Sequence, residues 1–217
     1  MAPKLYMAEG SAVVRSVLLT EAAIGISLDY IHVDLEKGQH LTSEFLKLNP
    51  LHTIPTLVDD DKAIFESAAI NIYLVEKYAK DKSFYPSDPY EKALVNEILF
   101  FCSNKFFPTA ATIIRPIMLM GATTINPEDV DRLIEVYGLL ETLLKGRVWA
   151  AGDKVTLADF ALIPLVSGSE VVAEYDRKQF PNIIRYLGKA KSLPYYNRNQ
   201  KGDEMFKTEV LRRLNRS

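Results

Sequence analysis

Short apolar runs alternate with helix-type spacing in the first 80 residues of the chain. Strands are predicted at 5–7, 28–33, 56–58 and 63–65. Helices are predicted at 13–23, 42–48 and 67–78, with Gly25 as a helix C-cap and Thr42 as an N-cap. A polar turn at 59–62 would join the last two strands as a hairpin. The order β-α-β-α-β-β-α is typical of a small α/β domain.

The pattern changes after residue 82. Residues 83–89 (SFYPSDP) hold two prolines and no periodicity, which indicates a linker, and 90–217 then carry helical signals alone. Asn126-Pro127 predicts a helix start, Thr156 and Asp159 a capping box, and Pro181 and Pro194 the start and end of another helix. Pro108 predicts a kink or break that could open a cavity. We therefore expect an α/β domain at 1–82 and an all-helical domain at 90–217.

The composition and net charge of the chain exclude several classes of protein. The 217 residues are 48% hydrophobic and 25% charged, with a net charge of −2, so neither a disordered chain nor a nucleic-acid partner is expected. One cysteine excludes an internal disulfide, and three histidines match no metal motif. No apolar stretch reaches about 18 residues and the N-terminus resembles no signal peptide, so we expect no membrane partner and a cytoplasmic setting.

Three strand ends carry candidate chemistry, each with a plainer alternative. Ser11 sits at a helix start, where an anion is favoured, or it is only an N-cap. A cis Pro55 would leave the backbone of Ile54 free for a peptide-like ligand, or the loop is ordinary and trans. Glu66 and Ser67 could hold an ammonium and a carboxylate group, or form a surface acid and a cap. No G-x-S-x-G motif supports a catalytic triad.

Taken together, these motifs resemble a known family. The residues Leu5-Tyr6, Gly10-Ser11, GQHLT at 38–42, FLKLNPLHTIPTLV at 45–58 and Glu66-Ser67 are similar to those of the cytosolic glutathione transferases. The insect delta and epsilon classes are the most similar, and an unassigned class stays open. The resemblance implies a thioredoxin-like N-terminal domain, an all-helical C-terminal domain, a homodimer and glutathione as co-substrate.

The resemblance also implies roles for individual residues. Ser11 would hydrogen-bond the glutathione sulfur and is the expected catalytic residue. The expected glutathione-binding residues are His40, His52, Thr53, Ile54, Pro55, Glu66 and Ser67. The expected hydrophobic-substrate residues are Val13, Phe107, Ala111, Ile114 and Phe206, for which core packing is the alternative. No metal is expected.

The resulting hypothesis is a glutathione transferase that conjugates glutathione to small hydrophobic electrophiles in detoxification, with a peroxidase side activity. A non-catalytic ligand carrier or protein-interaction module on the same fold is the alternative. Ala68 and Cys102 stand where the family pattern has Arg and a partner-subunit Asp, so two charges near the γ-glutamyl group are absent. Glu9 and Val13-Val14 also depart from the pattern. Cys102 is expected to pack in the core rather than act as a nucleophile.

Overall fold

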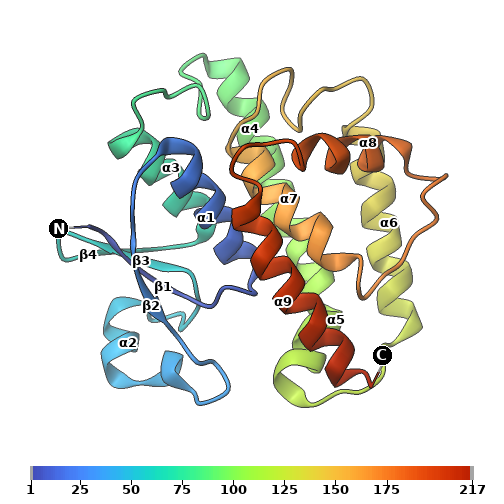
Figure 1. The fold of residues 1–217 in the computed structure, drawn as a ribbon, viewed down its shortest axis with the longest axis horizontal. Coiled ribbons are helices and arrows are strands. Elements are labelled where there is room, and N and C mark those ends of the chain that lie inside the picture. The colour runs from blue at the N-terminus through green and yellow to red at the C-terminus, as the bar shows by residue number, and fades with distance from the viewer. Residues whose placement is uncertain (1, 216–217) are drawn as a thin grey trace.

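The first apolar run forms strand β1 (Lys4–Met7), which lies inside a sheet of order β2-β1-β3-β4. The computed structural model describes residues 2–215, and Figure 1 shows this sheet beside a larger group of helices. The other strands are β2 (Asp29–His32), β3 (Thr56–Asp59) and β4 (Lys62–Phe65). β1 pairs parallel with β2 and antiparallel with β3, with Leu5 opposite Tyr30 and Leu57. The predicted strands are therefore confirmed.

The predicted hairpin joins β3 and β4 through two residues. Asp59 pairs with Lys62, and Asp60 and Asp61 both have positive φ angles of 46° and 63°. Two consecutive positive φ values match the twist of antiparallel strands, and aspartate tolerates them better than most residues. The polar turn therefore connects β3 to β4, the strand at the edge of the sheet, and β4 is followed by helix α3.

Helices cover both faces of the sheet. α1 (Ala12–Ile24) and α3 (Ser67–Tyr78) pack together on one face, and α2 (Ser43–Leu48) lies on the other (Figure 1). Leu5, Leu57 and Ile70 are fully buried between the sheet and the α1–α3 pair. On the opposite face, Phe45 of α2 meets Tyr6 edge to face at 5.7 Å. The domain core is thus assembled from the apolar positions that alternate along each strand.

A long helical stretch opens the second part of the chain. α4 (Pro89–Phe101) passes through a π-helical segment (Cys102–Phe106) into α5 (Phe107–Met120). Of the two outcomes expected at Pro108, a kink or a break, the break does not occur, because the helix continues through the wider turn. The N–H of Phe107 donates to the carbonyl oxygen of Cys102, five residues earlier. A proline clashes with the carbonyl four residues before it, and the π turn removes that register.

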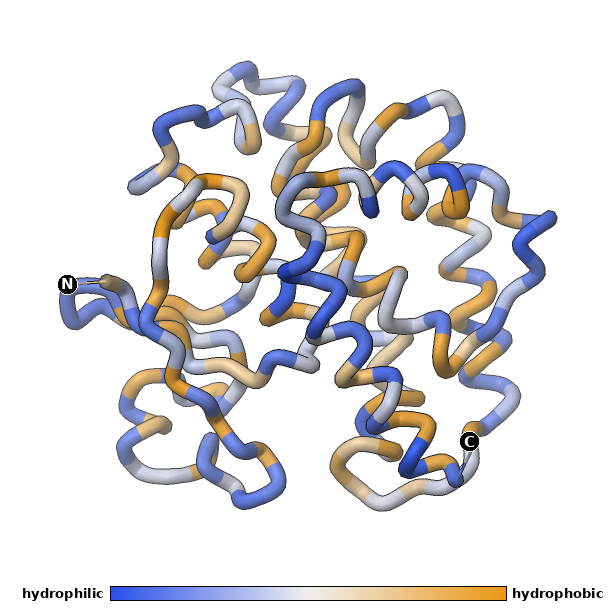
Figure 2. The backbone as a smooth tube through the Cα atoms, viewed as in Figure 1, coloured by the Kyte–Doolittle hydropathy of each residue, from blue (hydrophilic) through white to orange (hydrophobic). Residues whose placement is uncertain are grey.

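The remaining helices surround one buried helix. They are α6 (Pro127–Leu143), α7 (Leu157–Ser169), α8 (Pro181–Ala190) and α9 (Asn197–Arg213). Every residue of α7 is buried, and this helix packs against α1, α4 and α9. α8 ends at Ala190, before the expected stop at Pro194, because the chain enters turns at 191–192. Figure 2 shows hydrophobic and hydrophilic positions mixed along α6, α8 and α9, as expected of helices with one face in solvent.

The predicted capping box at the start of α7 is confirmed. Asp159 Oδ2 accepts from the N–H of Thr156 at 2.8 Å, and Oδ1 accepts from the N–H of Ala150 and the hydroxyl of Tyr186 at 2.9 and 3.0 Å. Burial raises the pKa of Asp159 to about 6. The hydrogen bonds act in the other direction and lower this pKa, but the effect of burial is larger. One carboxylate thus fixes both the helix start and the preceding loop.

The fold class is therefore an α/β domain followed by an all-helical one, as expected from the sequence. Among residues 2–215, none of the helices is long and apolar enough to cross a membrane.

Candidate functional site

Ser11 lies at the turn between β1 and α1 and begins that helix. Its φ and ψ of −69° and 125° are extended, as an N-cap requires, yet its hydroxyl makes no capping hydrogen bond. No acidic residue stands in the first turn of α1. The free N–H groups and the helix dipole therefore leave a local positive potential beside a hydroxyl that can donate to an anion.

Ser11 opens onto a cavity of about 520 Å³ in which the predicted glutathione-binding residues meet. The walls include all of the following predicted residues: Ser11, Val13, His40, His52, Thr53, Ile54, Pro55, Glu66, Ser67 and Phe107. They come from four separate segments of the first 67 residues and from α5. The sheet brings these segments together because strand ends in an α/β unit converge on one edge.

The loop before β3 contains the predicted cis bond between Ile54 and Pro55, which is confirmed. Asn49, fully buried, holds this loop: its amide donates to the Thr53 carbonyl and to the Thr56 hydroxyl, both at 3.0 Å. Among the described residues, the N–H and C=O of Ile54 have no hydrogen-bond partner. Ile54 thus presents a backbone edge to which an extended peptide could pair.

Glu66 and Ser67 lie on the same cavity, at the start of α3. Glu66 has a φ of 69°, a left-handed value that is unfavourable for a residue with a side chain. Its carbonyl still accepts the N–H of Ile70, so the strained residue is built into the helix start. Strain of this kind, about 1–3 kcal/mol, persists where the surrounding structure fixes it and is concentrated at binding sites.

Two histidines form the opposite end of the cavity. The rings of His40 and His52 lie 6.1 Å apart between centroids. Partial burial, and then the nearby His52, lower the pKa of His40, so its imidazole is neutral at pH 7. Within residues 2–215, the Nδ1 atom of His40 is buried and has no hydrogen-bond partner. That atom remains available to a polar group of a ligand.

A second cavity, of about 460 Å³, lies between the two domains on the other side of Ser11. Four of the five predicted hydrophobic-substrate residues line it: Phe107, Ala111, Ile114 and Phe206. Val13 is placed differently, on the wall of the first cavity. The second cavity is walled mainly by apolar side chains of α5, α7 and α9. An apolar ligand would therefore lie next to whatever occupies the first cavity.

The two cavities share residues that the sequence did not indicate. Besides Ser11 and Phe107, both are lined by Leu35, Arg115, Leu119 and Leu165. Arg115 lies over the Phe107 ring, 5.9 Å from its centroid. Arg115 and Leu119 lie on α5, Leu165 on α7 and Leu35 in the loop after β2, and none of them belongs to a motif in the sequence. Only the tertiary packing of these segments brings them to the junction.

Cys102 packs as expected. It is 4% exposed within the helical core, and burial, followed by the charge of Asp159, raises the pKa of its thiol, so it is not an activated nucleophile. Cys102 and Ala68 line the same cavity of the protomer.

No metal centre is found in the part of the chain that the structure describes: His, Cys, Asp and Glu side chains form no group of three able to hold an ion. The residues that line the first cavity offer hydroxyl, backbone, imidazole and carboxylate groups.

The thioredoxin-like domain carries the first cavity, and that cavity meets the more apolar second cavity at Ser11. Residues 1–76 match the glutathione S-transferase N-terminal domain, and residues 112–206 match the C-terminal domain. The chain therefore belongs to the glutathione S-transferase family.

Solved insect structures agree with this assignment. An epsilon-class glutathione S-transferase from the housefly, Musca domestica, is 36% identical with a TM-score of 0.93, covering 97% of this chain and 98% of that one. A delta-class enzyme from Nilaparvata lugens is 36% identical with a TM-score of 0.90, over 97% and 99%. A glutathione transferase homolog from Drosophila mojavensis with bound glutathione is 36% identical with a TM-score of 0.94, over 98% and 97%.

Proposed function

We propose that this glutathione transferase conjugates the thiolate of glutathione to small hydrophobic electrophiles in detoxification, with Ser11 as the catalytic residue. One observation carries the proposal: Ser11, whose hydroxyl makes no capping hydrogen bond, lines both the cavity that holds the predicted glutathione-binding residues and the more apolar second cavity. A thiol bound in the first cavity can thus meet an electrophile held in the second. A peroxidase side activity would use the same thiolate.

The stabilisation required of Ser11 is modest. Lowering a thiol pKa of about 8.5 by two units requires about 2.7 kcal/mol. A hydrogen bond to a charged sulfur contributes roughly 1.5–3 kcal/mol, and a helix N-terminus about 0.3–2 kcal/mol. The hydroxyl and the start of α1 are therefore sufficient together. The thiol proton leaves to solvent, and Ser11 donates a hydrogen bond without losing its own proton.

The bond changes then involve only the two substrates. The sulfur lone pair forms the new S–C bond, and the leaving group departs with the electron pair of the bond that breaks. No general base is needed, because the nucleophile is already ionised when the electrophile arrives. The residues shared by both cavities, Phe107 and Leu165 among them, would exclude water from the reacting atoms.

Glutathione would lie along the first cavity with its cysteinyl backbone paired to Ile54. The Glu66 carboxylate would hold the γ-glutamyl ammonium, and Ser67 would donate to the γ-glutamyl carboxylate. His40 and His52 would meet the glycine end, with Thr53 and Pro55 shaping the loop between. The unpaired backbone of Ile54 and the unpaired Nδ1 of His40 support this placement.

The electrophile would occupy the second cavity against Phe107, Ala111, Ile114 and Phe206. Val13 would contact the glutathione side rather than the electrophile, given its position. The natural electrophile is small and apolar, in keeping with a cavity of about 460 Å³.

We also infer a homodimer and residence in the cytoplasm, as in the cytosolic members of the family. Phe100 on α4 supports the dimer, since 64% of this large apolar side chain is exposed in the single protomer. The proposed domain division is 1–82, a linker at 83–89, and 90–217. Residues 83–88 fall between the end of α3 and the start of α4, and Pro89 is already the first residue of α4.

Two measurements on the purified chain test the function. Calorimetry with glutathione should show saturable binding, and an assay with an activated aryl halide should show conjugation that depends on glutathione. Binding of both ligands without turnover would instead indicate the non-catalytic carrier. Absence of glutathione binding would contradict the proposal.

A further inference from the structure

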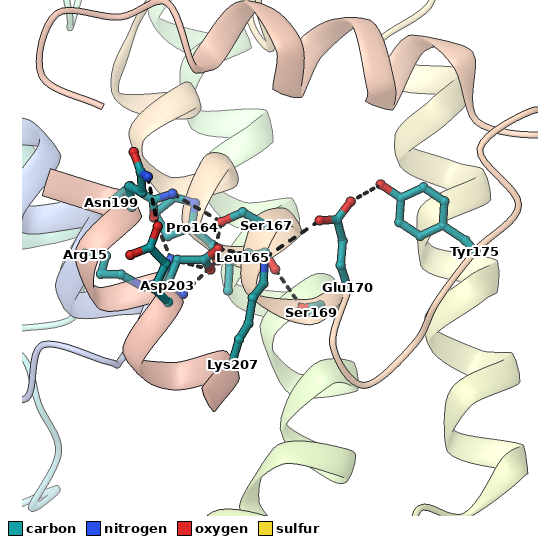
Figure 3. A network of polar contacts seen from close by, with 12 residues as sticks. Arg15, Pro164, Leu165, Ser167, Ser169, Glu170, Tyr175, Asn199, Asp203 and Lys207 are labelled. Carbon is teal, nitrogen blue, oxygen red and sulfur yellow. Dashed lines mark hydrogen bonds and ion pairs between the residues drawn. The ribbon is translucent and has the colours of Figure 1, made fainter. Parts of the chain in front are cut away.

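Arg15, on α1, is a fully buried cation whose partners belong to the other domain. Its Nη1 donates to Asn199 Oδ1 at 2.6 Å and to Asp203 Oδ1 at 2.9 Å, and its Nη2 donates to the Pro164 carbonyl at 3.2 Å. Figure 3 shows this guanidinium between α9 and α7. A charge removed from water in this way is stable only while its partners stay in place.

The partners are themselves held by further hydrogen bonds (Figure 3). Lys207 pairs with Asp203 Oδ2 at 2.8 Å, and the Ser167 hydroxyl donates to Asp203 Oδ1 at 3.2 Å. The amide of Asn199 donates to the same hydroxyl at 3.2 Å. Asn199 and Asp203 are therefore fixed in orientation, so they define one position for Arg15.

Two glycines leave the space that this arrangement needs. A Cβ on Gly202 would lie 2.2 Å from the carbonyl oxygen of Glu9 and 2.8 Å from Cδ of Arg15. A Cβ on Gly168 would lie 2.8 Å from Nη2 of Arg15. α9 therefore contacts the β1–α1 turn directly through its backbone, two residues before Ser11.

Arg15 and Ser11 are rigidly related, because the N–H of Arg15 donates to the carbonyl oxygen of Ser11 at 2.9 Å. We propose that Arg15 is a positioning residue: held by Asn199 and Asp203, it fixes the start of α1 so that the Ser11 hydroxyl faces the bound sulfur. This rests on the proposed role of Ser11. Its physical basis is that a shift of about 1 Å at a reacting group can cost about 100-fold in rate.

The chain offers a matched control on the same two helices. Arg198 pairs with Glu21 at 2.9 Å, so it also joins α9 to α1. Glu21, however, lies near the C-terminal end of α1, away from Ser11. Loss of this pair weakens the domain contact without releasing the helix start.

The experiment compares Asn199→Ala, Gly202→Ala and Arg198→Ala with the unchanged chain. Three quantities are measured: conjugation rate at neutral pH, the ultraviolet thiolate absorbance of bound glutathione against pH, and the unfolding temperature. Asn199→Ala and Gly202→Ala should slow conjugation at least about tenfold and move the thiolate titration to higher pH. Arg198→Ala should lower the unfolding temperature and leave the titration unchanged. Asn199→Asp, which keeps an acceptor for Arg15, should restore most of the rate.

The possible results distinguish the proposed catalytic role of Ser11 from the proposed positioning role of Arg15. If Ser11→Ala shifts the thiolate titration but Asn199→Ala and Gly202→Ala do not, the positioning role is wrong and the role of Ser11 stands. If Ser11→Ala leaves the titration unchanged, both are wrong. A shift equal in Arg198→Ala and Asn199→Ala would mean that domain stability alone is responsible, which also overturns the positioning role. If Asn199→Ala fails to fold, Gly168→Ala decides the matter with the same expected results, because it keeps every polar group and places its Cβ 2.8 Å from Nη2 of Arg15 itself.

Discussion

Ser11 and Arg15 lie one turn apart at the start of α1, and their side chains extend toward different parts of the molecule. The backbone carbonyl of Ser11 accepts the N–H of Arg15 at 2.9 Å, while the Ser11 hydroxyl faces the junction of two cavities. The Arg15 guanidinium points away, into the helical domain, where its donors are met by α9 and α7. One helix turn therefore links the hydroxyl at the proposed catalytic position to the residue proposed to anchor it.

Replacing Ser11 by alanine should lower conjugation at least tenfold, or about 1.4 kcal/mol of transition-state stabilisation. The reason is the loss of a charge-assisted hydrogen bond to the sulfur. Steady-state kinetics against pH would show the rate rising at higher pH than in the unchanged chain. Ser11→Thr keeps a hydroxyl and serves as the control. An unchanged turnover and pH profile in Ser11→Ala would exclude this role.

Glu66→Gln should weaken glutathione binding about tenfold or more, with little change in stability. The substitution keeps the side-chain shape and the backbone but removes the charge opposite an ammonium group, which is worth roughly 1.5–3 kcal/mol. Calorimetry measures the change. Glu44→Gln, on the first turn of α2 and outside both cavities, is a matched control. Equal affinities for the two variants would argue against the assignment.

Ala68 and Cys102 should be coupled when charges are restored. Cys102→Asp alone buries a carboxylate near Asp159 and should reduce stability and help binding little, and Ala68→Arg alone should add little. The double variant should bind glutathione more tightly than the sum of the two single effects predicts, with a coupling of about 0.5–3 kcal/mol. A double-mutant cycle read by calorimetry measures it. Effects that add within about 0.3 kcal/mol would show that the positions are independent.

Asp159 should make stability depend on pH. Burial raises its pKa to about 6, above an unfolded value of about 3.9, so the folded state holds the proton more tightly. The stability that protonated Asp159 contributes to the folded state is fully present below about pH 4 and is lost as the pH rises to about 6. The stability of the unchanged chain relative to Asp159→Asn should therefore fall by up to about 3 kcal/mol across that range. Urea unfolding at several pH values tests this, and a constant difference would contradict it.

The chain should run as a dimer of two 24.5 kDa protomers. Phe100→Glu should favour the monomer, because it places a charge where an exposed aromatic side chain would be covered. Light scattering at micromolar concentration measures the mass. Tyr90→Glu changes an equally exposed aromatic residue at the other end of α4 and shows whether the effect is local. A monomeric mass for the unchanged chain would refute the dimer.

Local signals settled several element boundaries in both domains. The αL conformation of Gly25, the cap at Thr42 and the capping box of Thr156 with Asp159 follow from residue chemistry within a few positions. Such features depend on short-range sterics and hydrogen bonds, so a reader of the sequence can place them.

The path of the backbone at Pro108 needed more than local chemistry. A proline predicts disruption of the helix, but it does not say whether the chain breaks or widens its turn. Here the π-helical segment keeps α4 and α5 continuous, with Phe106 fully buried and Phe107 at the junction of the cavities. Packing against α7 and α6 selects that outcome.

The sequence by itself determined the fold class through local patterns of apolar and polar residues, and its motifs, through their resemblance to a known family, predicted the glutathione-binding residues that meet in the first cavity. The tertiary structure decided which side chains join the two cavities, that Val13 faces the first of them, and that Arg15 is held by α9. Arg15 and Asn199 are 184 positions apart. Contacts at that separation depend on how helices pack, and no spacing along the chain encodes them.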